Sequence, residues 1–231
     1  SKITFGHYKT QEVTVQATDS LSGIGRIYYY VDRTQGNTPL SAEELRELGS
    51  DKWESSDLVT FTLGDEDGYV IYAYAVDKAG NQSAYICSDG IVIDNTPPML
   101  ALEKPQGGGL KDTSAVPLAR MNEAGNITYI LLDAADSGIT AEKILHSADR
   151  GTGSITAEQA GKDIELYFSG LRANVTYYLY AVGTDAAGNI SNQVASLSFT
   201  TQKSPIAGTV LLAGKEVFGE TLTASVEIET E

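Results

Sequence analysis

The sequence predicts an all-β chain of two β-sandwich modules in tandem, with a short helix inserted in each. Three observations lead to this prediction: an internal repeat, apolar side chains that alternate at period two, and turns rich in Gly, Asp and Asn. The chain has 231 residues, which is long for one ordinary domain, and 42% of them are hydrophobic, which is enough for globular cores.

The internal repeat is clearest where residues 69–83 match residues 177–191, a shift of 108 positions (177 minus 69). Both segments run from a tyrosine-rich strand into an Asp-x-Ala-Gly-Asn turn. Upstream, residues 40–45 resemble residues 139–144 at a shift of 99, so the same features follow one another in both copies and only loop lengths differ. Two homologous modules of about 100 residues are the simplest interpretation, since that is the size of a sandwich domain.

Proline-containing segments divide the chain into residues 1–97, 98–203 and 204–231. Pro97 and Pro98 cannot donate to a β-ladder, so they predict an extended and stiff junction after the first copy. Pro205 follows the second copy in the same way. The remaining residues are too few to bury a core, and we expect them to be the opening strands of a third, truncated module.

Strands are predicted where apolar and polar residues alternate, because a half-buried antiparallel strand exposes every second side chain. The clearest inward-facing sets are Val13, Val15 and Ala17, then Val59, Phe61 and Leu63, then Ile164, Leu166 and Phe168.

The helix of the first copy is predicted from its start and stop signals. Ser41 can cap it while Glu44 reaches back, Leu40 and Leu45 can form a hydrophobic staple, and Gly49 can end it. We expect it to cross between the sheets or to close one end of the sandwich.

The second copy keeps the cap and the staple but not the full capping box. Thr140 is the cap and Ile139 and Ile144 are the staple, whereas Lys143 stands where the box requires a glutamate. The second helix is therefore expected to be weaker.

Charge and cysteine content exclude several classes of protein. With 16 Lys and Arg against 31 Asp and Glu, the formal charge of −15 disfavours nucleic acid and anionic membrane surfaces as partners. No run of about 18 apolar residues predicts a membrane span in this segment. Cys87 is the only cysteine, so neither an internal disulfide nor a thiolate zinc site is possible, and we expect it to be a small packed residue.

Catalysis and cofactor binding have no support in the sequence. His7 and His146 lie in different modules, and no Ser or Cys stands in a Gly-x-Ser-x-Gly context. We therefore predict a non-enzymatic chain without catalytic residues or cofactors.

Residues 171–189, which include Leu171, Tyr177 and Asn189, resemble a segment of known modules. They look like the sixth strand of a fibronectin type III or bacterial immunoglobulin-like (Ig-like) module, and Leu63 with Tyr69 fits the same pattern in the first copy. In that family the tyrosine hydroxyl bonds back to the chain near the corner. Further likeness lies in residues 17–24, 122–129 and 208–224.

What this resemblance implies is a pair of Ig-like and fibronectin type III-like sandwiches from a multidomain bacterial protein that is secreted or held at the cell surface. The resemblance gives a structural role to the corner tyrosines, and turn chemistry gives one to the residues of the two Asp-x-Ala-Gly-Asn turns. The structural residues are Tyr69, Tyr177, Asp77, Gly80, Asn81, Asp185, Gly188 and Asn189.

The acidic turns also raise the hypothesis of a calcium site formed by Asp19, Asp77 and Asp94, because calcium prefers carboxylate oxygens. Turn chemistry is the favoured interpretation, since Asp and Asn bond to their own backbone and Gly accepts positive φ. No metal is therefore predicted.

Four tyrosines that the strand alternation turns outward form a candidate ligand platform. They are Tyr72 and Tyr74 in the first copy and Tyr178 and Tyr180 in the second, with Tyr28 and Tyr30 expected on a neighbouring strand. Cross-strand aromatic pairing, or a cover by the helix, is the favoured alternative to ligand binding.

The function predicted from the sequence is a structural spacer whose partners are the adjacent modules of the same chain. The alternatives are an adhesive or binding module for a glycan or a host or matrix protein, and an accessory region of a secreted carbohydrate-active enzyme.

Overall fold

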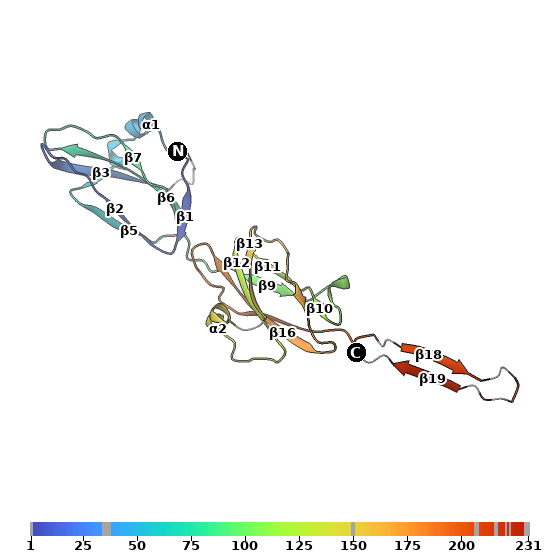
Figure 1. The fold of residues 1–231 in the computed structure, drawn as a ribbon. Helices are drawn as coiled ribbons and strands as arrows, with labels where there is room; N and C mark the ends of the chain where they lie inside the picture. The colour runs from blue at the N-terminus through green and yellow to red at the C-terminus, as the bar shows by residue number, and fades with distance from the viewer. Residues whose placement is uncertain are drawn as a thin grey trace.

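The structure is a computed structural model that describes residues 2–33, 38–148, 151–205, 208–214, 217–219, 221 and 223–228. It confirms the predicted fold class: strands dominate, they form sandwiches, and the two α-helices among the described residues have six residues each. Figure 1 shows the two sandwiches and a C-terminal hairpin following one another along the chain.

The first sandwich has a larger and a smaller sheet. The larger sheet has the order β1-β8-β6-β3-β4, with β7 also paired to β6, and the smaller one is β2-β5. The strands are β1 (Phe5–Tyr8), β2 (Gln11–Val15), β3 (Ile24–Asp32), β4 (Glu54–Ser56), β5 (Val59–Leu63), β6 (Asp67–Asp77), β7 (Ile86–Cys87) and β8 (Gly90–Ile93). The core between the sheets holds Val15, Ile27, Val59, Leu63, Tyr69, Ile71, Ala73, Ala75 and Ile93.

The second sandwich sets the sheet β13-β12-β16-β17 against β14-β11-β9 and the pair β10-β15. The strands are β9 (Leu100–Glu103), β10 (Ser114–Ala115), β11 (Leu118–Met121), β12 (Gly125–Leu132), β13 (Thr152–Ala157), β14 (Ile164–Glu165), β15 (Phe168–Ser169), β16 (Thr176–Asp185) and β17 (Ala195–Thr200). Its core holds Ala115, Ala119, Met121, Ile127, Leu131, Ala157, Leu166, Tyr177, Leu179, Ala181 and Phe199.

Helix α1 (Ala42–Glu47) begins as the sequence predicts. The Ser41 hydroxyl accepts from the backbone N–H of Glu44, and the Glu44 carboxylate accepts from the backbone N–H of Ser41, which completes the capping box. A 3-10 turn, η1 (Ser50–Lys52), follows it, and a second, η2 (Gly107–Gly109), lies in the other sandwich. In helix α2 (Ala141–His146), Thr140 caps Lys143 without a reciprocal glutamate.

The position of both helices differs from our expectation that they cross between the sheets or close a sandwich end. Leu45 of α1 packs on Val70 and Tyr72, which alternate along β6 with the core residues. Ile144 of α2 packs in the same way on Tyr180 and Val182 of β16. Each helix therefore covers the outer face of the larger sheet, because that face carries a second apolar cluster.

The C-terminal hairpin pairs β18 (Gly208–Ala213) with β19 (Thr223–Ile228). Val210 lies opposite Val226, and both are more than 60% exposed, so the hairpin adds no buried core within the described chain. Within the described residues, no helix is long and apolar enough to cross a membrane.

Candidate functional site

The corner tyrosines each fix the start of a long strand. The Tyr69 hydroxyl donates to the backbone carbonyl of Asp65 at 2.8 Å, and the Tyr177 hydroxyl accepts from the backbone N–H of Arg172 at 2.9 Å. Both rings are buried in their cores. The same side chain thus ties the loop before β6 and the loop before β16, with opposite donor roles.

The two Asp-x-Ala-Gly-Asn turns close the far ends of these strands with the same hydrogen bonds. In the second module both the backbone N–H and the side-chain amide of Asn189 donate to the Asp185 carboxylate, each at 2.8 Å. In the first module Asn81 donates to Asp77 twice, each at 2.7 Å.

A glycine is required in each of these turns by the backbone itself. Gly80 has φ +90° and Gly188 has φ +83°, a region that side chains with a Cβ rarely adopt. The turn chemistry expected from the sequence therefore accounts for all three residue types.

The two turns differ in what surrounds them. Asn189 is only 6% exposed, and its amide makes one more hydrogen bond, of 2.8 Å, to the backbone carbonyl of Asp94. Asn81 is exposed. The turn at Asp185 is therefore tied to the junction that follows β8. Among the described residues, no hydrogen bond ties the Asn81 side chain to a linking segment in this way.

The junction is anchored on both sides. Glu66, in the corner loop of the first module, accepts from the backbone N–H of Asn95 at 3.0 Å and from the Thr96 hydroxyl at 2.8 Å. On the second module, the Asn122 side chain accepts from the backbone N–H of Met99 at 2.6 Å. Pro98 between them is less than 2% exposed. The junction is therefore hydrogen-bonded to both modules and buried at Pro98, although Asn95, Thr96 and Met99 are exposed.

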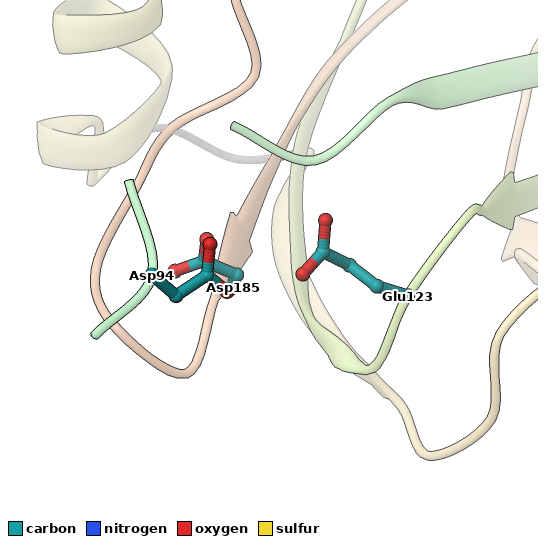
Figure 2. A group of neighbouring side chains, drawn as sticks. All are labelled: Asp94, Glu123 and Asp185. Carbon is teal, nitrogen blue, oxygen red and sulfur yellow. The ribbon is translucent and has the colours of Figure 1, made fainter. Parts of the chain in front are cut away.

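Three carboxylates meet at this junction, those of Asp94, Glu123 and Asp185, as Figure 2 shows. They come from the end of β8, the turn before β12 and the end of β16, and one oxygen of each lies within 4.8 Å of the others. Burial, followed by the charges of Asp94 and Asp185, raises the pKa of Glu123. Within the described chain this is the one cluster of such side chains that could hold a metal ion.

The chemistry of the cluster suits a hard cation such as calcium, which binds six to eight oxygens. Three carboxylates supply part of such a shell, although both oxygens of Asp185 already accept from Asn189. Glu123 was not among the residues that the sequence analysis identified as candidate ligands. It lies in residues 122–129, a segment that was considered only for its resemblance to known modules.

The grouping of Asp19, Asp77 and Asp94 considered from the sequence does not form. Asp94 lies in the junction cluster, whereas Asp19 and Asp77 share Ser22, whose hydroxyl is 2.8 Å from a carboxylate oxygen of each. Hydrogen bonds from the Asn81 and Ser22 side chains lower the pKa of Asp77 to about 2, and the Ser22 hydroxyl lowers that of Asp19.

Three of the four tyrosines expected to face outward pack in the clusters beneath the helices, and the fourth, Tyr74, packs against other aromatic rings. Tyr72 lies 2% exposed beneath α1, and its hydroxyl accepts from the backbone N–H of Leu40 at 2.9 Å. Tyr180 is covered in the same way, with its hydroxyl accepting from the backbone N–H of Asp136 at 3.0 Å. Tyr178 is half-buried against the Ile144 cluster. Helix cover, the alternative considered above, thus removes most of the platform.

Tyr74 belongs to an aromatic cluster on the outer face of the first module. It stacks on Tyr28 with ring centroids 4.8 Å apart, and it makes edge contacts with Trp53 at 4.9 Å and Tyr85 at 5.2 Å. All four rings are half-buried.

The fold and these contacts define a modular β-sandwich protein. No protein-family model and no curated protein matches the chain. Among solved structures, the crystal structure of the FN1–FN3 domains of chicken CNTN1 is similar, with 9% sequence identity and a TM-score of 0.36. The match covers 88% of this chain and 64% of that chain, so the chain spans less than two thirds of that structure.

Proposed function

We propose that the chain is a non-enzymatic structural spacer, in which residues 1–97 and 98–203 are sandwich modules held at a fixed angle and residues 204–231 open a third module. The observation that carries the proposal is the junction. Its backbone is hydrogen-bonded to Glu66 on one side and to Asn122 and Asn189 on the other. A linker tied to both neighbours restricts their relative rotation, which a flexible linker does not.

The setting we propose is a bacterial protein that is secreted or held at the cell surface. The resemblance of residues 171–189 and 17–24 to bacterial Ig-like and fibronectin type III modules supports it. The adjacent modules are then the main partners of each sandwich.

A binding role for a glycan or a matrix protein is the second candidate. It is favoured by the half-buried cluster of Tyr28, Trp53, Tyr74 and Tyr85, whose neighbouring rings offer a stacking surface.

The spacer function is tested by measuring the distance between the two modules. Spin labels are attached to cysteines at two exposed positions, Leu58 and Tyr167, in a chain in which Cys87 is replaced by Ser. Double electron–electron resonance should give one narrow distance distribution. Replacing Pro97 and Pro98 by Gly should broaden it. A broad distribution in the chain with both prolines intact would reject a fixed junction.

A further inference from the structure

The first sandwich has an open edge along β2. This strand pairs with β5, from Gln11 opposite Leu63 to Val15 opposite Val59, and among the described residues no strand pairs with its other edge. An unpaired edge exposes a row of backbone N–H and C=O groups that another strand can use.

A groove with both apolar and polar lining residues runs beside this edge and reaches the core. A cavity of about 510 Å³ is lined by Val15 and Ala17 on one side and by Ala73 and Ile86 on the other, with the core residue Ile27 in its wall. A second cavity of about 310 Å³ continues it past Val13. Ile86 is 59% exposed although its cross-strand partner, Ala73, is buried in the core.

The second sandwich shows what closes such an edge. There β11 pairs with β14 on one side and with β9 on the other, with Met121 opposite Leu100 and Leu118 opposite Glu103. Leu100 and Leu102 of β9 pack against the core. The occupant is thus an antiparallel strand with apolar residues at alternate positions.

The first strand of the chain does not fill this place in the first sandwich. β1 pairs in parallel with β8 instead, and Ile3, just before it, packs on Leu45 and Tyr72 on the outer face. The edge of β2 therefore stays open with the described N-terminal residues in place.

The end of the groove near Asp19, beyond the C-terminal end of β2, favours a positive charge. Asp19 and Asp77 line its mouth, and in an antiparallel arrangement the N-terminus of the incoming strand lies there. The side-chain amide of Asn81 has two N–H groups and gives one to Asp77. In the second sandwich the same amide, that of Asn189, gives its other bond to the chain that leads into β9.

We propose that the open edge of β2 accepts an extended peptide strand from a partner protein, by β-augmentation. The strand runs antiparallel to β2, places apolar side chains at alternate positions in the groove, and carries a positive charge at its N-terminal end. The binding energy comes from backbone hydrogen bonds, and the specificity comes from the alternate side chains. This function is independent of the spacer role.

The probe is a synthetic peptide with the sequence of residues 98–104, Pro-Met-Leu-Ala-Leu-Glu-Lys, with a free amino terminus. It should bind the full chain in fluorescence anisotropy. Replacing either leucine of the peptide by Ser should weaken binding by about tenfold, since a buried leucine contributes about 1.5 kcal/mol or more. The Ile86→Asp chain should also bind at least about tenfold more weakly. Its circular dichroism should be unchanged because Ile86 is mostly exposed.

Disulfide trapping locates the peptide. Peptides with one cysteine in place of each of residues 99–103 in turn are incubated in a glutathione buffer with the Ile86→Cys, Cys87→Ser chain. Trapping should peak at alternate peptide positions, because successive side chains of a strand point to opposite faces. The Tyr167→Cys, Cys87→Ser chain is the control: position 167 is 72% exposed but lies in the second sandwich, away from the groove, and its cysteine should trap less and without a preference for alternate positions.

Equal trapping at all positions, or binding that neither the Ser peptides nor Ile86→Asp weakens, would overturn the proposal. The proposal would also be overturned if the chain is dimeric in light scattering and binds the peptide only after residues 206–231 are deleted. In that case the C-terminal segment of a second copy would be the occupant of the β2 edge. A monomer that traps the peptide with a period of two supports it.

Discussion

The side-chain amide of Asn189 donates a 2.8 Å hydrogen bond to the backbone carbonyl of Asp94, 95 positions earlier in the chain. The same amide binds the Asp185 carboxylate, so one side chain closes a turn and holds the junction at once. Asn81 closes the corresponding turn of the first module and is exposed. Two turns of identical chemistry therefore have different mechanical roles.

Asn189→Ala should loosen the junction and destabilise the second module by about 2 kcal/mol, because it removes a hydrogen bond to a buried carboxylate and one to the junction backbone. Hydrogen exchange should become faster at residues 94–99. Asn81→Ala is the matched control, and it should change less because water can replace the lost donor at the exposed turn. Equal effects of the two variants would show that the bond to Asp94 adds nothing.

The sequence predicts the parts of this site that are local and misses those that depend on assembly. The turn at Asp185, the corner at Tyr177 and the cap at Ser41 follow from short motifs in which the partners lie within a few residues. The cluster of Asp94 with Glu123 does not, because its members come from separate segments that only the junction brings together. Cys87 was expected to be packed and is exposed, because β7 is a short strand at an open edge.

The placement of the helices shows the same limit. The capping signals of α1 predict where it begins, since they act within one turn of the chain. They do not say which surface Leu45 covers. That depends on the second apolar face of β6, formed by Val70 and Tyr72, which period-two alternation alone describes as solvent-facing.

Glu123→Gln should stabilise the chain at neutral pH. Burial and the charges of Asp94 and Asp185 raise the pKa of Glu123, so the ionised form is unfavourable in the folded state. The natural chain should regain stability as the pH falls through the raised pKa, whereas the amide is neutral throughout. The difference in melting temperature should therefore be largest near about pH 7 to 8 and vanish once Glu123 is protonated.

Glu158→Gln is the control for this pH series, because Glu158 is exposed and outside the cluster. Melts with calcium chloride and with a chelator complete it. If Glu123→Gln lowered the melting temperature in calcium, the three carboxylates would be holding a cation and repulsion would not govern the site.

Tyr177→Phe should cost about 1 kcal/mol, since it removes the hydrogen bond to the Arg172 backbone and keeps the packing of the ring. Tyr69→Phe should cost a similar amount through Asp65. The chain has one tryptophan, Trp53, so denaturation followed by its fluorescence reports on the first module alone. That signal should detect Tyr69→Phe and not Tyr177→Phe. Circular dichroism should detect both, and Tyr8→Phe should change neither signal.

Tyr74→Ala separates ring packing from ligand binding on the outer face of the first module. The Tyr74 ring lies between Tyr28, Trp53 and Tyr85, so its removal should cost about 2 to 3 kcal/mol, less than for a fully buried aromatic residue. Tyr74→Phe keeps the ring and should be close to neutral. Trp53 lies 4.9 Å from Tyr74, so its fluorescence maximum should move to longer wavelength in the folded alanine variant alone. A glycan array probed with the natural chain and with both variants completes the comparison. If Tyr74→Ala abolished binding to a glycan while leaving the unfolding transition in place, the cluster would be a ligand surface, because packing rings cannot be removed without loss of stability.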